Sequence, residues 1–260
     1  MLGAIIGDIV GSRFEFNNWT GSKGFKMFVG TCDYTDDTVC TIAIADAILK
    51  GVPYKDSLLQ WCRRYPNPMG AYGSGFNAWL HSADPQPYNS CGNGSAMRVS
   101  PVGWAFDEKE MMLRHAKATA IMSHNHPEGI KGAEAVAYAI WYIRVHGYHK
   151  DMLFKYLGEF YPGWQRKQYP QGVFDGTCQG TVPVAFQIIK NSYSFEDAIR
   201  NAILWGGDSD TLAAIVGSIA EAIWGVPWDI AQKAVSFLPE EMVEVLTQFQ
   251  CLYQNRFNVL

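Results

Sequence analysis

Two short stretches place carboxylates and hydroxyls together at the beginning of apolar segments. Residues Thr35–Asp37 are consecutive, and Asp208, Asp210 and Thr211 fall within four positions. One side-chain oxygen is enough to cap a helix, so three oxygen-bearing side chains in each stretch exceed what capping requires. Adjacent carboxylates repel one another unless a cation lies between them or one of them stays protonated. The pattern therefore indicates a cation site, with helix capping as the alternative for either stretch taken alone.

The ligand atoms in these stretches favour a hard divalent cation. Mg²⁺ and Mn²⁺ prefer carboxylate, hydroxyl and water oxygens, whereas zinc sites use histidine and cysteine, which are absent from both stretches. Asp208 and Thr211 are three positions apart and would lie on one face of a helix. Two helix beginnings that face each other would supply oxygens from both sides, enough to hold two ions.

Helical spacing of apolar residues dominates the rest of the sequence, so we expect one all-α domain over residues 1–260. Two helices should stop at a Gly-Val-Pro sequence, after Lys50 and after Trp224. No alternating pattern is long enough to require a sheet, although residues 25–29 could pair locally. The expected helices cover residues 37–50, 54–64, 109–122, 129–146, 179–190, 195–205, 210–224 and 239–252.

Three long loops rich in glycine, proline and asparagine separate these helices, at residues 66–76, 84–95 and 161–178. Long loops in a compact domain are usually functional or disordered. We therefore expect these three loops to form the walls of a cleft.

Composition excludes several classes of protein. The formal net charge of −4 does not suit a protein that binds nucleic acid through its phosphates. The sequence has no apolar run of membrane-spanning length, and the apolar N-terminal stretch contains Asp8 and no preceding basic region, so neither a membrane span nor a signal peptide is expected. The six cysteines form no CxxC pair, which is typical of reduced thiols. We expect a cytoplasmic protein without nucleic-acid or membrane partners.

Two further motifs are ambiguous when judged by their residues alone. The sequence GNGSAMR, residues 92–98, could expose backbone N–H groups to an anion, or it could be an ordinary glycine-rich turn. His124 and His126 could belong to a zinc site, but no third ligand follows at a usual spacing, and packed histidines are the alternative.

Five motifs in the same order resemble the ADP-ribosylglycohydrolase family. They are GDIVGSRFE (7–15), TDDT (35–38), GNGSAMR (92–98), SHNHPEGIKGA (123–133) and GGDSDT (206–211). The resemblance runs from Gly7 to about Trp224. It implies an all-α orthogonal helical bundle with a binuclear magnesium or manganese site in a central cleft, where ADP-ribose is cleaved from an acceptor.

The resemblance also assigns residues to the metal site. Thr35, Asp36 and Asp37 match the first metal motif of the family, Asp208, Asp210 and Thr211 match the second, and Glu15 matches an acidic position close to the metals and the substrate. Five carboxylates carry a charge of about −5 and two dications about +4, so the cluster is nearly neutral and tolerates partial burial.

Substrate-binding residues follow from the same resemblance. The family binds the diphosphate of ADP-ribose at the positions of Ser90, Gly92, Asn93, Gly94 and Ser95, and a histidine at the position of His124 lies near the nucleotide end of the cleft. His126 receives no role. No single aromatic residue can be selected to stack on adenine.

The expected function is that of a hydrolase that uses two divalent cations, Mg²⁺ or Mn²⁺, to release ADP-ribose from protein, with arginine-linked ADP-ribose as the leading substrate. Glu15, Asp36 and Asp37 are the catalytic candidates, and the sequence does not decide which of the carboxylates takes the proton. The alternatives are a serine-linked or small-molecule ADP-ribosyl substrate, and a protein that binds ADP-ribose without cleaving it. The complete set of motif ligands favours an enzyme, and loops 66–76 and 161–178 should determine the acceptor.

Overall fold

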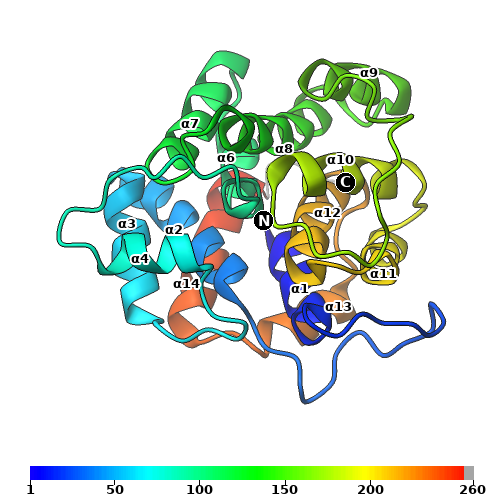
Figure 1. The fold of residues 1–260 in the computed structure, drawn as a ribbon, viewed down its shortest axis with the longest axis horizontal. Coiled ribbons are helices and arrows are strands. Elements are labelled where there is room, and N and C mark those ends of the chain that lie inside the picture. The colour runs from blue at the N-terminus through cyan, green and yellow to red at the C-terminus, as the bar shows by residue number, and fades with distance from the viewer. Residues whose placement is uncertain (255–260) are drawn as a thin grey trace.

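The computed structural model describes residues 1–254, and they form fourteen α-helices with a 3-10 turn, η1 (Ser12–Phe14), and a final π-helical turn, η2 (Gln250–Gln254). No β-strand occurs in these residues, which contain only two isolated bridges. The helices cross one another around a central pair, α1 and α12 (Figure 1). They are α1 (Leu2–Gly11), α2 (Asp36–Lys50), α3 (Tyr54–Arg64), α4 (Ser74–His81), α5 (Gly94–Met97), α6 (Ser100–Ala105), α7 (Lys109–Ile121), α8 (Pro127–His146), α9 (Lys150–Phe160), α10 (Cys178–Lys190), α11 (Phe195–Trp205), α12 (Ser209–Trp224), α13 (Trp228–Val235) and α14 (Glu240–Phe249).

The expectation of an all-α fold is confirmed. Each of the eight expected helices is present, and every end lies within three residues of its expected position. The structure adds α1, α4, α5, α6, α9 and α13, and residues 25–29 form no strand. Helix α1 escapes a search for helical periodicity because all ten of its residues are buried, which leaves it without a polar face.

Glycines bring α1 and α12 into direct backbone contact. A β-carbon on Gly3 would lie 2.2 Å from the carbonyl oxygen of Gly217, and one on Gly7 would lie 2.0 Å from that of Ala213. At Gly11 the nearest atom would be the α-carbon of Asp210, at 2.4 Å. Because no side chain fits between these backbones, α1 is fixed against the first turns of α12.

Local signals set the limits of α2, which carries the first acidic stretch. The side chain of Thr35 caps its beginning by accepting a hydrogen bond from the backbone N–H of Asp37, at 3.2 Å. Gly51 ends the helix in the left-handed conformation, with φ 65°. The Gly-Val-Pro stop expected at this point is therefore confirmed, and Gly225 ends α12 with φ 69°.

Within residues 1–254, no helix is both long enough and apolar enough to cross a bilayer.

Candidate metal centre and substrate cleft

The two acidic stretches meet in space. Helix α2 begins at Asp36 and α12 begins at Ser209, and the hydroxyl of Thr211 donates a hydrogen bond to Oδ2 of Asp37 at 3.2 Å. The expectation that two helix beginnings face each other is confirmed. Residues that are about 170 positions apart in the sequence therefore surround one small volume.

Helix capping accounts for only part of this cluster. Thr35 is a cap, but Asp208, at the N-cap position of α12, makes no capping hydrogen bond with its side chain. Its Oδ2 instead accepts a hydrogen bond from the side-chain amide of Asn93 at 2.7 Å. Oδ1 of Asp37 is buried and has no hydrogen-bond partner among residues 1–254. These oxygens are available to a ligand of another kind, and a buried acceptor without a partner is costly unless something binds it.

Three carboxylates of the cluster lie within reach of a single ion. Glu15, Asp208 and Asp210 each offer an oxygen, and these oxygens lie within 4.8 Å of one another. The donor set is made of oxygen atoms alone, which suits Mg²⁺ or Mn²⁺ better than zinc. The residues therefore fit a hard divalent cation at the junction of η1 and α12.

The negative charges of the carboxylate cluster are not balanced by positively charged side chains of the described residues. Within residues 1–254, none of its carboxylates takes part in an ion pair. Burial, and then the charge of Asp208, raises the pKa of Glu15 to about 7. Burial and neighbouring carboxylates raise the pKa of three others well above the usual range, namely Asp36, Asp37 and Asp210. A bound cation would remove this repulsion.

Asp8 belongs to this site, and sequence analysis gave it no role. Its Oδ1 accepts a hydrogen bond from the hydroxyl of Thr35 at 2.7 Å. Its Oδ2 accepts from the backbone N–H groups of Thr35 and Thr38, both at 3.0 Å, and from the hydroxyl of Thr38. Asp8 thus ties α1 to the beginning of α2. The only sign of this role in the sequence is a charge inside an apolar stretch.

A cleft of about 440 Å³ opens beside the carboxylates. Glu15, Asp36, Asp208, Asp210 and Thr211 line its floor. The three loops that sequence analysis identified all contribute to its walls, so that expectation is confirmed. Their lining residues are 70–76, 88, 90, 92–94, 174 and 176, of which 74–76 begin helix α4.

Residues of the GNGSAMR motif differ in what they offer to the cleft. The backbone N–H of Gly92 donates to Ser90 Oγ at 3.0 Å, and that of Asn93 donates to the carbonyl oxygen of Gly176 at 2.8 Å. Ser90, Gly92, Asn93 and Gly94 line the cleft. The hydroxyl of Ser95 is buried and donates to the carbonyl oxygen of Gly129 at 2.7 Å.

The two histidines of the SHNHP sequence lie in different surroundings. His124 lines the cleft and has aromatic neighbours, with its ring centroid 5.8 Å from that of Tyr88 and 6.4 Å from that of Phe76. His126 caps helix α8, where Nδ1 accepts a hydrogen bond from the backbone N–H of Glu128 at 3.1 Å. The histidines therefore form no pair of metal ligands with each other.

An exposed pair of aromatic rings lines the cleft, and the sequence alone singles out neither of them. Phe16 and Phe174 stack with centroids 6.3 Å apart and an interplanar angle of 13°. They are 76% and 53% exposed, although both line the cleft. The two residues come from separate loops, so only the folded chain shows that they form a pair.

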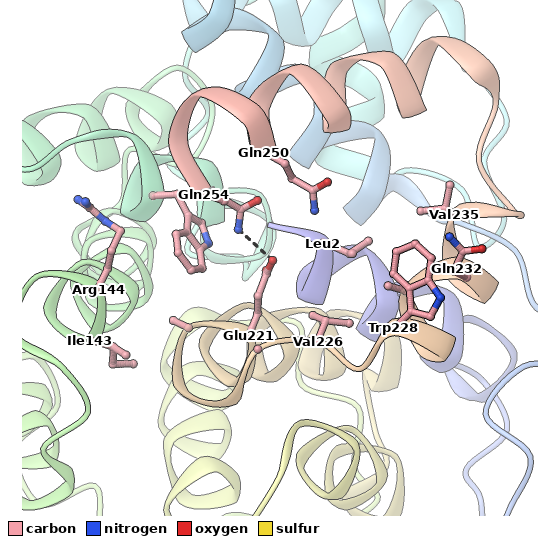
Figure 2. A pocket seen from close by; sticks show the side chains of 14 residues that line it. Leu2, Ile143, Arg144, Glu221, Val226, Trp228, Gln232, Val235, Gln250 and Gln254 are labelled. Carbon is pink, nitrogen blue, oxygen red and sulfur yellow. Dashed lines mark hydrogen bonds between the residues drawn. The ribbon is translucent and has the colours of Figure 1, made fainter. Parts of the chain in front are cut away.

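A larger pocket, of about 660 Å³, lies at the other end of α12 (Figure 2). Glu221 in this pocket is eleven residues beyond Asp210, which corresponds to about 16 Å along a helix. Its carboxylate accepts hydrogen bonds from the N-terminal amine of Met1, the backbone N–H of Gly3 and the side chain of Gln254. Among the described residues, Glu221 is the one carboxylate that lines this pocket, and the partners named above satisfy it, so the pocket is separate from the candidate metal centre.

Comparison with known proteins identifies relatives of the whole chain. The sequence model of a family described as ADP-ribosylglycohydrolase matches residues 1–257. The chain is 25% identical over 289 residues to ADP-ribosylarginine hydrolase Tri1 of Pseudomonas putida (strain GB-1). This alignment covers 94% of this chain and 72% of that protein. It is 22% identical to ADP-ribosylhydrolase ARH3 of Danio rerio, over 98% of this chain and 90% of that protein. A solved structure, "ADP-ribosylglycohydrolase-related protein complex", shares the fold, with a TM-score of 0.72, 22% identity and 96% coverage of both chains.

Proposed function

The chain belongs to the ADP-ribosylglycohydrolase family, and on this basis we propose that it hydrolyses the glycosidic bond between ADP-ribose and protein, with arginine-linked ADP-ribose as the main substrate. The convergence of the carboxylates on the floor of one cleft supports this proposal most directly. A relative named for hydrolysis of ADP-ribosylarginine supports the choice of arginine.

We propose that two divalent cations, Mg²⁺ or Mn²⁺, are held between the beginnings of α2 and α12. The unpartnered Oδ1 of Asp37 and the close oxygens of Glu15, Asp208 and Asp210 support this assignment. Bound cations would supply positive charge to the ribose hydroxyls and to an attacking water. The expected ligands are the same as those of the motifs, namely Thr35, Asp36, Asp37, Asp208, Asp210 and Thr211.

Glu15 is the best candidate to take a proton from the attacking water. It is partly exposed and lines the cleft, whereas Asp37 is buried and accepts a hydrogen bond from Thr211. A general base must reach the reacting atoms, and geometry therefore favours Glu15 over Asp37. Asp36 also lines the cleft and remains the second candidate.

The stacked rings of Phe16 and Phe174 support an arginine acceptor. A guanidinium is planar and stacks on aromatic faces, whereas a serine side chain offers nothing to a ring. If these rings receive the acceptor, Phe174→Ala should reduce release of arginine-linked ADP-ribose more than release of serine-linked ADP-ribose. Tyr193→Ala is the matched control, because Tyr193 is 86% exposed and does not line the cleft.

The decisive experiment is incubation with arginine-, serine- and glutamate-linked ADP-ribosyl proteins in Mg²⁺ or Mn²⁺, with released ADP-ribose measured by mass spectrometry. We expect release from the arginine-linked substrate, loss of release in EDTA and recovery after metal is restored. If the protein binds ADP-ribose but releases it from none of these substrates, it would be a protein that binds ADP-ribose without cleaving it, and the proposed hydrolase activity would be rejected. If ADP-ribose were released only from serine-linked or small-molecule substrates, the proposed acceptor would change from arginine to one of these. The partner of the protein would still be an ADP-ribosylated protein or small molecule.

A further inference from the structure

Three buried polar side chains, Arg98, Ser123 and His124, are connected by hydrogen bonds beside the cleft, and Arg98 and His124 line it. Arg98 donates through Nη2 to the carbonyl oxygen of Thr119 at 2.7 Å and to Ser123 Oγ at 2.9 Å. Ser123 Oγ lies 2.8 Å from Nδ1 of His124. The three residues are 1%, 0% and 5% exposed, so water does not replace these hydrogen bonds.

The direction of each hydrogen bond in this chain follows from the chemistry of its members. A guanidinium can only donate, so Ser123 Oγ accepts from Arg98 and its own hydrogen needs another acceptor. Among the described residues, the acceptor within reach of that hydrogen is Nδ1 of His124. If Nδ1 carried the hydrogen, the serine hydroxyl would be left buried without an acceptor, which is unfavourable.

The charge state of His124 agrees with this direction. Burial, and then the positive charge of Arg98, lowers the pKa of His124 well below its ordinary value. The ring is therefore neutral at physiological pH, with Nδ1 as an acceptor and the hydrogen on Nε2.

The Nε2 atom of His124 faces the glycine-rich bend. A β-carbon on Gly94 would lie 2.9 Å from Nε2, and one on Gly92 would lie 3.4 Å from it. The backbone N–H groups of Gly92 and Asn93 already have partners within the protein. The absence of side chains at Gly92 and Gly94 lets the bend lie against Nε2, and all three residues line the cleft in which a ligand would bind.

We propose that Arg98 and Ser123 are positioning residues that hold His124 in one tautomer, as a neutral Nε2–H donor to an oxygen of the substrate's diphosphate. The diphosphate as ligand rests on the proposed function, whereas the tautomer rests only on the three buried side chains. In this arrangement Nε2 cannot accept a proton, so His124 binds and orients the substrate and does not act as a general base.

The tautomer can be measured without any nucleotide. Protein labelled with ¹⁵N-histidine should give, for His124, the nitrogen shifts and two-bond couplings of a neutral ring protonated at Nε2 between pH 6 and pH 8. The spectrum of His124→Gln identifies the signals. A ring protonated at Nδ1, or an imidazolium at pH 7, would overturn the proposal. In Ser123→Ala the tautomers should mix, an effect that simple loss of stability does not produce.

Titration of ADP-ribose by calorimetry tests the ligand. Because the amide nitrogen of glutamine can take the place of Nε2, His124→Gln should bind nearly as well as the wild type, whereas the shorter His124→Asn should lose about tenfold or more. Ser123→Ala should weaken binding in the wild type and have no further effect in His124→Gln, because it acts through the histidine. Equal effects of Ser123→Ala in both backgrounds would reject a positioning role.

A matched control is available on the neighbouring histidine. His126→Gln alters a helix cap outside the cleft and should leave the affinity for ADP-ribose unchanged. If the wild type does not bind ADP-ribose, the assignment of the diphosphate fails together with the proposed function. The tautomer would then still be decided by the NMR measurement.

Discussion

Asp8 accepts hydrogen bonds at the beginning of α2, the helix that carries Asp36 and Asp37 of the candidate metal centre. Its two oxygens accept from the backbone and hydroxyl groups of Thr35 and Thr38, which form the first turn of α2. A residue that orients ligands in this way influences metal affinity without contacting the ion. Asp8 thus holds in place the first turn of α2, which contains Asp36 and Asp37.

We predict that Asp8→Asn weakens Mn²⁺ binding by about 10–100-fold, because the amide NH₂ would face other donors and disturb the beginning of α2. Asp46→Asn is the control, since Asp46 is also a buried carboxylate and lies within α2. Its carboxylate accepts hydrogen bonds from the side chains of Trp61 and Lys50. Thermal melting should show that both variants lose stability. Calorimetric titration should show a change in Mn²⁺ affinity for Asp8→Asn alone, and equal affinities would reduce Asp8 to a purely structural role.

Asp210→Asn should have opposite effects on stability with and without metal. Burial and the neighbouring carboxylates raise the pKa of Asp210 well above its ordinary range, so removal of its charge relieves repulsion in the metal-free protein. In EDTA the variant should therefore melt at a higher temperature than the wild type. In Mn²⁺ it should melt at a lower temperature and lose about 100-fold or more in turnover. Wild-type turnover in limiting Mn²⁺ would contradict a role as metal ligand.

At the scale of elements, the contact between α1 and α12 sets the dimensions of the centre. Helix α1 leads through η1 to Glu15, and α12 carries Asp210, so the separation of the two helices fixes the separation of these carboxylates. The close contact depends on glycines that expose bare backbone.

Gly7→Ala should force these helices apart, because its methyl group would lie 2.0 Å from the carbonyl oxygen of Ala213. Overpacking of this kind usually costs about 1–3 kcal/mol and sometimes more. We expect a lower unfolding free energy in urea and weaker Mn²⁺ binding. Gly30→Ala is the control, since no atom lies within 4 Å of its added methyl group, and it should leave both quantities nearly unchanged. Similar losses in both variants would refute this account of the contact.

The sequence allowed the amphipathic helices and the two acidic stretches to be predicted, because both depend on local spacing. It did not reveal α1, which is buried on all sides, or the role of Asp8, whose partners are 27 and 30 residues away. Helix α9 was also missed, and its pattern offers no clear reason. Phe16 and Phe174 could not be paired in advance, because their contact exists only once distant loops come together.

At the scale of the whole molecule, the carboxylates link stability to pH. Burial, opposed by hydrogen bonds from Thr35 and Thr38, leaves the pKa of Asp8 raised to about 6, and the pKa of Glu15 is raised to about 7. A carboxyl group whose pKa is higher in the folded than in the unfolded state binds more protons when folded. Its contribution to stability is therefore complete below the unfolded pKa and is lost as pH rises through the folded pKa.

For the metal-free protein, this linkage predicts that stability falls as pH rises from about 4 to about 7. Mn²⁺ should remove or reverse this slope, because it binds the deprotonated carboxylates of the folded state and therefore stabilises the protein more strongly as pH rises. Melting temperatures measured between pH 4.5 and pH 8, in EDTA and in Mn²⁺, provide the test. Parallel curves would show that the buried carboxylates are not linked to a metal.

Helix α1 also dictates when this protein can fold during its synthesis. All its residues are buried in the finished molecule, yet α12, against which it packs, begins only at Ser209. A ribosome that has not yet passed α12 therefore holds an apolar helix without its main partner and a carboxylate cluster that lacks Asp208 and Asp210. Such a nascent chain exposes the kind of surface that chaperones bind. Helix α1 thus leaves the ribosome before the helix against which it packs, and a product truncated before α12 should be unstable.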